Sequence, residues 1–144
     1  MKIRKATEDD TEVLMDIWEK SEYNKKSVAK MKLAIDMSMR FSENYLVLNP
    51  NPIGNFVITN KRDITYLNYI NLIKSKQGKG FGKKMLEDVI KIAKENKSKK
   101  IQLAVWAKNF RAILLYTKFG FYVSGFKRKF DKELGKKLVM EKMV

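Results

Sequence analysis

A glycine-rich turn is the feature that most constrains how this chain can fold. Residues 77–82 read Gln-Gly-Lys-Gly-Phe-Gly, with glycines at every second position. The preceding run, residues 64–73, is rich in strand-forming residues, and the apolar residues after the turn recur at helical spacing. A glycine-rich turn between a strand and a helix exposes backbone N–H groups at the positive end of the helix. The sequence therefore predicts a phosphate or pyrophosphate site at this turn.

Two common phosphate-binding motifs do not fit the spacing of the turn. A P-loop requires Ser or Thr after its Gly-Lys pair, but Gly82-Lys83 is followed by Lys84. A dinucleotide fingerprint requires glycine at the position of Lys83 and an acidic residue about 20 residues further on. Residues 96–100 contain no acid. The motif that remains is Q-x-x-G-x-G.

Composition removes several classes of site chemistry. The chain contains no cysteine and no histidine. Disulfides, zinc fingers, cysteine nucleophiles, Ser-His-Asp triads and HExxH metal sites are therefore excluded. Catalysis must depend on Tyr, Asp, Glu, Lys, Ser, Thr, backbone amides or water, and we expect no metal.

Length and charge indicate one domain, residues 1–144, in a cytoplasmic protein. No apolar run approaches the ~18 residues that a membrane helix needs, and the N-terminus lacks an apolar signal core. The net charge of +15 suggests an anionic partner. Because the lysines are dispersed and no aromatic–basic platform stands outside the core pattern, a solvated surface is favoured over a nucleic-acid site.

Periodicity and turn residues predict an α+β fold with a mostly antiparallel sheet flanked by helices, in the order β-α-α-β-β-β-α-β-α-β-β. Thr7 and Asp10 form a predicted capping box before the first helix, and Ser27 caps the second. The predicted strands cover residues 2–6, 44–48, 54–59, 64–73, 100–106, 122–130 and 137–143, and the last two helices cover 81–95 and 109–118.

A second motif lies downstream, at residues 109–121, and reads N-x-x-A-x-x-x-Y-x-x-x-G-F. Asn109, Ala112 and Tyr116 share one face of the predicted helix. Together with Q-x-x-G-x-G, this motif resembles the GCN5-related N-acetyltransferase (GNAT) superfamily, in its small single-domain bacterial or archaeal type. The resemblance covers nearly the whole chain, and both motifs occur in the family's order.

The resemblance implies a domain that binds acetyl-CoA as cosubstrate. The pyrophosphate would lie on the N–H groups of the glycine turn, with Lys79, Lys83 and Lys84 neutralising phosphate charge. The pantetheine arm would pair with the strand backbone, as an added strand does. The residues that the resemblance assigns to the cofactor are Leu72, Ile73, Gln77, Gly78, Lys79, Gly80, Phe81, Gly82, Lys83, Asn109 and Tyr116.

The resemblance also implies direct attack of a primary amine on the thioester, since no cysteine can carry the acetyl group. Tyr116 is the expected general acid toward the CoA sulfur, and a backbone N–H around Leu72 is the expected oxyanion donor. The general base is open, because residues 66–72 contain no carboxylate. Glu22, Glu43 or a water chain gated by asparagines such as Asn68 and Asn71 are the candidates.

Two departures from the family pattern concern the turn. Its first position is Gln77, where many members have arginine, and a proline often found before the turn is replaced by Lys74-Ser75.

The acceptor, the oligomeric state (monomer or homodimer) and the physiological role stay open. The net basic region of residues 22–41 favours a protein amine, or a small amine that bears an anionic group. Two other readings remain: a nucleic-acid or ribosome-associated binding module, and a catalytically weak acyl-CoA sensor.

Overall fold

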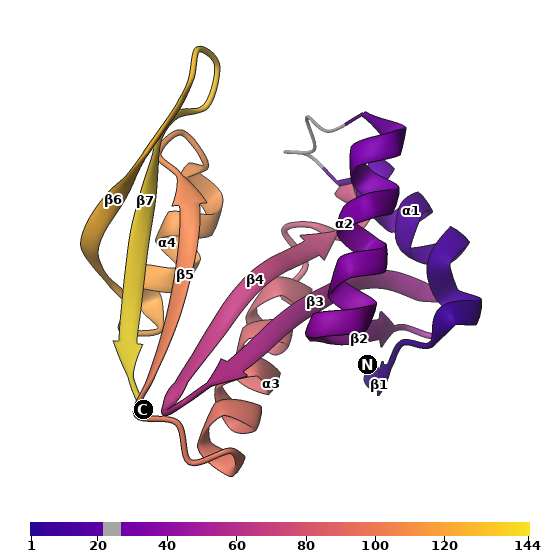
Figure 1. Cartoon of the computed structure of the whole chain (residues 1–144), viewed down its shortest axis with the longest axis horizontal. Coiled ribbons are helices and arrows are strands. Elements are labelled where there is room, and N and C mark those ends of the chain that lie inside the picture. The colour runs from indigo at the N-terminus through magenta and orange to yellow at the C-terminus, as the bar shows by residue number, and fades with distance from the viewer. Residues whose placement is uncertain (22–26) are drawn as a thin grey trace. The chain divides into compact units, whose positions relative to one another are not determined.

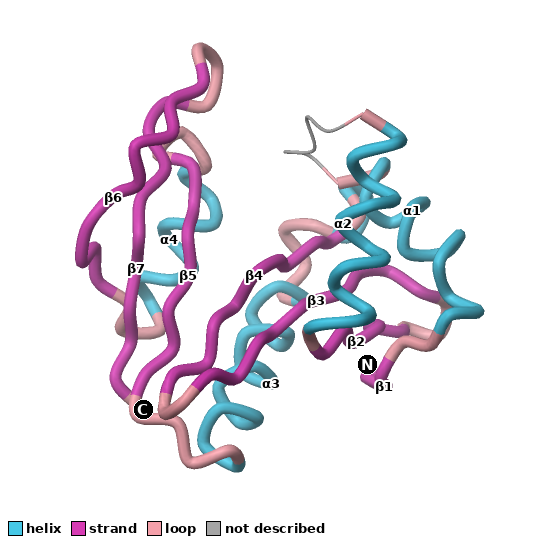
Figure 2. The backbone as a smooth tube through the Cα atoms, in the orientation of Figure 1, coloured by secondary structure: helices cyan, strands magenta, loops and turns pink. Residues whose placement is uncertain are grey.

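The computed structural model describes residues 1–21 and 27–144. The described chain contains four α-helices and seven strands, coloured from the N- to the C-terminus in Figure 1 and by element type in Figure 2. It divides into two compact units. The first comprises residues 1–59 and 68–85, and the second comprises residues 60–67 and 86–144.

Helices and antiparallel strands form the first unit. Strands β1 (Lys2–Lys5), β2 (Glu43–Leu48) and β3 (Pro52–Lys61) pair in that order. Two helices, α1 (Thr11–Glu19) and α2 (Val28–Phe41), each bury an apolar stripe. Their shared core consists of Leu14, Ile17, Trp18, Met31, Ile35 and Leu46. Burying such side chains stabilises the unit by about 1.5–3 kcal/mol each.

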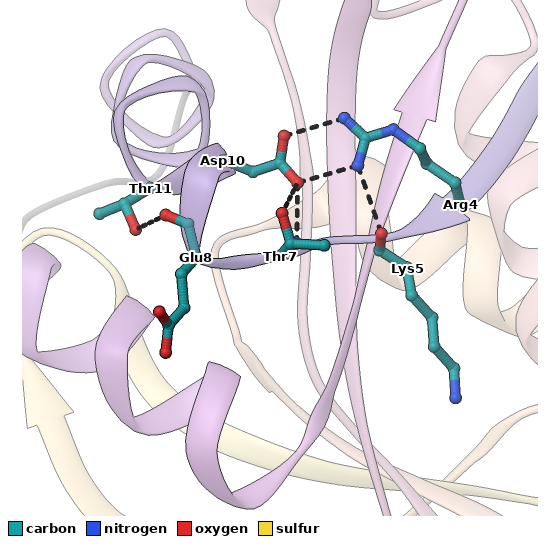
Figure 3. A network of polar contacts seen from close by, with 6 residues as sticks. All are labelled: Arg4, Lys5, Thr7, Glu8, Asp10 and Thr11. Carbon is teal, nitrogen blue, oxygen red and sulfur yellow. Dashed lines mark hydrogen bonds and ion pairs between the residues drawn. The ribbon is translucent and has the colours of Figure 1, made fainter.

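The helix starts follow the predicted caps. The Asp10 carboxylate accepts from the Thr7 N–H at 2.8 Å, just before α1, and Ser27 Oγ accepts from the Lys30 N–H at the start of α2. Asp10 also accepts two hydrogen bonds of 2.8 Å from the Arg4 guanidinium (Figure 3). Those bonds hold the pKa of the Asp10 carboxyl at about 2, well below its usual value. The capping carboxylate is therefore charged at neutral pH.

The second unit is built on a mixed sheet. The first part of β4 (Ile64–Leu72) runs parallel to β5 (Lys100–Trp106), and the ladder joins Ile64–Leu67 to Lys100–Leu103. Strand β7 (Gly135–Met143) pairs antiparallel with β5 and with β6 (Tyr122–Asp131). The whole strand order is β1-β2-β3-β4-β5-β7-β6. This mostly antiparallel sheet with flanking helices confirms the α+β class and the predicted element order.

Two further helices complete the chain. Helix α3 (Phe81–Glu95) follows the glycine turn and passes from the first unit into the second. Helix α4 (Phe110–Lys118) follows β5 and belongs to the second unit. Helix α3 begins within the glycine motif, at Phe81, and α4 begins directly after Asn109, the first residue of the second motif.

A one-residue shift interrupts the pairing of β3 with β4. The hairpin turn at Arg62 and Asp63 sets Asn60 opposite Thr65, whose hydroxyl donates to Asn60 Oδ1 at 2.8 Å. Counting equal steps from this pair places Leu72 opposite Ile53, yet Ile53 accepts from the Ile73 N–H at 2.9 Å. Strand β4 therefore contains one extra residue, a β-bulge.

The bulge brings two asparagines to one face of β4. Asn68 donates to Thr59 Oγ1 at 2.6 Å, and Asn71 donates to Asn55 Oδ1 at 3.1 Å. Thr59 and Asn55 share a face of β3, because they are four positions apart and side chains alternate with a period of two. Without the bulge, Asn68 and Asn71 would point to opposite faces.

Candidate active site

The glycine turn adopts a backbone conformation that requires glycine at two positions. Gly78 has φ of 74° and Gly80 has φ of 87°, the left-handed region that side chains disfavour. Apart from the two adjacent residues, no atom in the described part of the chain lies within 4 Å of where a Cβ would stand on either glycine. The space beside both glycines is open, so a ligand can approach their backbone directly.

The start of α3 supplies unpaired donors next to this turn. The first helical hydrogen bond runs from the Lys84 N–H to the Gly80 carbonyl at 3.2 Å. The N–H groups of Phe81, Gly82 and Lys83 precede it and have no acceptor within the helix. These donors, at the positive end of a helix, form the anion site that the sequence predicts.

Lysines surround the turn without being buried. Lys79, Lys83 and Lys84 are all exposed, and Lys84 Nζ lies 5.9 Å from the centre of the Phe81 ring. Exposed lysines with long flexible stems add positive potential without fixing geometry. The turn therefore combines fixed backbone donors with adaptable cations.

Gln77 connects the turn to the end of β4. Its side-chain Nε2 donates to the Leu72 carbonyl at 2.9 Å. Ile73 directs its N–H to Ile53 and accepts at its own carbonyl from the Lys76 N–H at 3.0 Å. Because backbone groups alternate along a strand, the Leu72 N–H points away from β3. Of the two strand residues predicted to pair with pantetheine, Ile73 is already engaged within the chain, and Leu72 directs its N–H outward.

A chain of polar side chains crosses the sheet of the first unit. Asn71 donates to Asn55 Oδ1 at 3.1 Å, Asn55 donates to Asn44 Oδ1 at 3.1 Å, and Asn44 donates to Ser38 Oγ at 3.0 Å. Ser38 Oγ in turn donates to the Ile35 carbonyl at 2.7 Å. Asn55, Asn44 and Ser38 are all buried. We refer to these five residues as the asparagine chain.

The direction of the asparagine chain is fixed by its last member. A backbone carbonyl only accepts, so the Ser38 hydroxyl must donate to Ile35, and its oxygen is left to accept from Asn44. Each amide then has to donate toward Ser38 and accept from the side of β4. Asn71 Oδ1 stands at the open end, and no residue in the described part of the chain donates to it. The fold therefore presents a polarised acceptor oxygen on β4, next to Leu72.

Tyr116 is buried in the second unit, within α4. Its side chain is 5% exposed, and its ring centre lies 5.6 Å from that of Phe121. Burial raises the pKa of the Tyr116 phenol well above its usual value. Within residues 1–21 and 27–144, the phenol has no hydrogen-bond partner. The phenol thus stays protonated at neutral pH, which suits a proton donor and not a base.

Asn109 is the N-cap of α4. Its Oδ1 accepts from the Ala112 N–H at 3.3 Å, and its own N–H donates to the Trp106 carbonyl at 2.9 Å. The helix therefore begins one residue later than predicted, at Phe110. The predicted cofactor role of Asn109 remains a prediction, and capping accounts for its oxygen.

Two carboxylates, Glu43 and Glu22, are the candidate general bases. Glu43 Oε2 accepts from the Tyr45 hydroxyl at 2.9 Å, and Glu43 also pairs with Lys5 at 3.8 Å. Strand alternation puts Glu43 on the face of β2 opposite Asn44, away from the asparagine chain. Glu22 lies outside the described residues. Among residues 1–21 and 27–144, no group of His, Cys, Asp and Glu could hold a metal ion.

The predicted site residues fall in both units. Leu72, Ile73 and the turn from Gln77 to Lys83 belong to the first, whereas Asn109 and Tyr116 belong to the second. The asparagine chain escaped sequence reasoning, apart from Asn71, because its members are distant in sequence. Its only signal was an asparagine within each of three apolar strands.

Comparison with known proteins identifies the class. The model of the acetyltransferase (GNAT) family matches residues 11–121. This chain belongs to the GNAT family of acetyltransferases. No helix in the described part is both long and apolar enough to cross a membrane.

Curated relatives match only part of the chain. The probable spermine N(1)-acetyltransferase of Bacillus subtilis subsp. natto (strain BEST195) is 42% identical over 67 residues, which are 46% of this chain and 44% of that protein. The matching segment thus spans less than half of the curated relative.

Solved structures share the fold across nearly the whole chain. The ribosomal-protein-S18-alanine N-acetyltransferase from Escherichia coli has a TM-score of 0.86 at 18% identity, over 99% of this chain and 93% of that one. A GNAT family acetyltransferase from Elizabethkingia anophelis, with acetyl-CoA bound, has a TM-score of 0.80 at 22% identity, over 99% and 97%.

Proposed function

We propose that this protein is an acetyl-CoA-dependent N-acetyltransferase that moves the acetyl group from the CoA thioester to a primary amine. The observation that carries the proposal is the glycine turn, where open backbone at Gly78 and Gly80 meets the free N–H groups that begin α3. A pyrophosphate matches such a site in charge and in hydrogen-bonding capacity. Family membership supplies the cosubstrate that bears this pyrophosphate.

The residues of the turn have separate tasks in binding. Backbone N–H groups of residues 78–83 hold the pyrophosphate, and Lys79 and Lys83 balance its charge. Gln77 keeps the turn joined to Leu72. The outward N–H of Leu72 is available to the thioester oxygen at the end of the pantetheine arm.

The reaction requires three proton and charge adjustments. The amine nitrogen forms a bond to the thioester carbon while the carbon–sulfur bond breaks, and the oxygen carries negative charge in between. The Leu72 N–H donates to that oxygen. Tyr116 gives its proton to the departing sulfur, a role for which its protonated, desolvated phenol is suited. The proton of the amine leaves through water, since β4 contains no carboxylate.

Asn71 orients the acceptor in this proposal. Its Oδ1 accepts a hydrogen bond from the amine N–H, and the asparagine chain behind it prevents the amide from rotating to offer its NH2 group. A fixed acceptor aligns the nitrogen lone pair with the carbonyl carbon and lowers the entropic cost of reaching the transition state.

Two acceptor classes are supported by different observations. The positive net charge of +15, and Lys30, Lys32 and Arg40 on α2, favour a protein amine or a small amine with an anionic group. A polyamine is the second candidate, because the curated relatives are named for spermine and spermidine. A polycation would need local acidic groups to overcome this charge.

Turnover tests the proposal directly. Purified protein and acetyl-CoA are mixed with one amine at a time: spermine, a peptide with N-terminal alanine, or a lysine-containing peptide. The release of free CoA thiol is followed in each reaction. We expect amine-dependent release with at least one acceptor, largest for the peptides. Saturable acetyl-CoA binding without release on any amine would instead identify an acyl-CoA sensor.

A further inference from the structure

Strand β6 forms an exposed edge with an unusual line of apolar side chains. It is last in the strand order and pairs with β7. Val123, Phe126 and Phe130 are 52%, 67% and 70% exposed. Single exposed apolar residues are ordinary, but two nearly free phenylalanine rings on one strand favour a binding surface.

Irregular pairing gathers these side chains on one face. Val123 lies opposite Met140, Phe126 opposite Leu138, and Phe130 opposite Lys136. Those three β7 partners alternate along their strand, so they share a face, and their β6 neighbours share it with them. Register shifts after Val123 and after Lys127 allow this, because they change the interval between like-facing residues on β6.

Cations accompany the rings. Lys136 Nζ lies 5.0 Å from the centre of the Phe126 ring, within cation–π distance. Arg128 and Lys129 are exposed between the two phenylalanines, whereas Lys127 lies opposite Lys137 and faces the other side of the hairpin. We call Val123, Phe126, Phe130, Lys136, Arg128 and Lys129 the β6 surface. The exposed rings and cations of β6 form an aromatic–basic platform that the sequence alone did not indicate.

We propose that the β6 surface binds single-stranded nucleic acid. Bases stack on the exposed rings of Phe126 and Phe130, and phosphates lie against Arg128, Lys129 and Lys136. This pairing of aromatic faces with a basic groove wall is how single strands are bound without sequence readout. The inference is independent of the acetyltransferase proposal.

Charge argues for this occupant over a second copy of the chain. Two molecules of net charge +15 repel one another, and juxtaposed like charges disfavour an interface that contains the basic β6 surface. A polyanion gains from the same charge, because its binding releases counterions. The exposed rings provide contact that dispersed lysines alone would not.

Fluorescence anisotropy with a labelled oligouridine of about 16 nucleotides tests the proposal. The double variant Phe126→Ala/Phe130→Ala is compared with Phe41→Ala, which removes a ring that is 67% exposed on α2. The charge variant Arg128→Glu/Lys129→Glu is compared with Lys91→Glu/Lys94→Glu, which makes the same charge change on exposed α3 lysines. Acetyl-CoA binding and melting temperature check folding in each variant.

The wild type should bind the oligonucleotide at about 50 mM KCl and weaken steeply by about 200 mM. Loss of both rings should reduce affinity at least ~10-fold, while Phe41→Ala keeps wild-type affinity. The charge variant on β6 should lose more affinity than its α3 control. Absence of binding at low salt, or equal losses in variants and controls, would overturn the proposal. So would concentration-dependent dimerisation in sedimentation that Phe126→Ala/Phe130→Ala abolishes.

Discussion

Gln77 Nε2 donates to the carbonyl oxygen of Leu72 at 2.9 Å, so one side chain fastens the glycine turn to the end of β4. The bond joins the predicted pyrophosphate donors to the backbone N–H that faces the acyl group in the proposed mechanism. A glutamine can make this bond because its side-chain NH2 group donates to a main-chain carbonyl. Having Gln77 where many family members have arginine therefore changes the charge of the site more than its geometry.

Replacing Gln77 with alanine should weaken acetyl-CoA binding about 5–30-fold, which corresponds to about 1–2 kcal/mol. The turn loses its connection to Leu72 but no buried apolar contact, so the melting temperature should barely change. Isothermal titration, with Lys76→Ala as neighbouring control, measures the difference. Equal dissociation constants for wild type and Gln77→Ala would show that the bond does not organise the site.

Asn55 is the middle of the asparagine chain and is 2% exposed. Asn55→Leu should lower the free energy of unfolding by about 2–4 kcal/mol, because Asn71 Nδ2 and Asn44 Oδ1 both lose a partner. Asn68→Leu serves as the control. Asn68 is exposed on the same sheet and donates to Thr59, which is not part of the asparagine chain. Urea denaturation of both variants gives the comparison. Similar decreases in the free energy of unfolding of Asn55→Leu and Asn68→Leu would contradict cooperative hydrogen bonding along the asparagine chain.

Tyr116→Phe keeps the aromatic packing against Phe121 and removes only the hydroxyl. We expect kcat to fall about 10²–10⁴-fold, with acetyl-CoA affinity and melting temperature nearly unchanged. Because burial raises the pKa of the phenol, the wild-type rate should show no loss from Tyr116 ionisation up to pH ~10. A variant that retains full kcat would exclude the phenol as proton donor.

The Arg4–Asp10 pair predicts how stability depends on pH. Its lowered pKa of about 2 contributes stability above the unfolded value of ~3.9, and this contribution is lost as pH falls from ~4 to ~2. Asp10→Asn should cost about 1–3 kcal/mol at pH 7, and the difference from wild type should shrink over that acid range.

Asp16→Asn is the matched control for this measurement. The Asp16–Lys20 pair is 2.9 Å long, close to the 2.8 Å of the Arg4–Asp10 pair, but both of its side chains are more than half exposed. Its loss should change stability by less than ~1 kcal/mol at any pH. If both variants showed the same pH profile, the Arg4 bonds would not be the source of the lowered pKa.

Local patterns predicted the parts of the site that one segment encodes. Helix α3 spans Phe81–Glu95 and β5 spans Lys100–Trp106, as predicted, because glycine, helical spacing and alternation are read within a single element. Ser27 and the Thr7–Asp10 box were equally local. The single-domain prediction stays a prediction beside the two compact units.

Register between strands was beyond such patterns. The bulge in β4, and the shifts that align Phe126 with Phe130, depend on which residue of a partner strand lies opposite, and period-two alternation assumes no extra residue. Asn109 shows a milder case, because a helix pattern alone does not separate a cap from the first helical residue.

Titration of acetyl-CoA into the wild type, Gly80→Glu and Gly125→Glu tests the central claim most directly. Gly80 needs its positive φ and has open space for a ligand, whereas Gly125 has the same open space without a positive φ. We predict saturable binding to the wild type and to Gly125→Glu, and loss of binding in Gly80→Glu from backbone strain and repulsion of phosphate. No binding to the wild type at about 1 mM acetyl-CoA, or undiminished binding to Gly80→Glu, would contradict a pyrophosphate site at this turn.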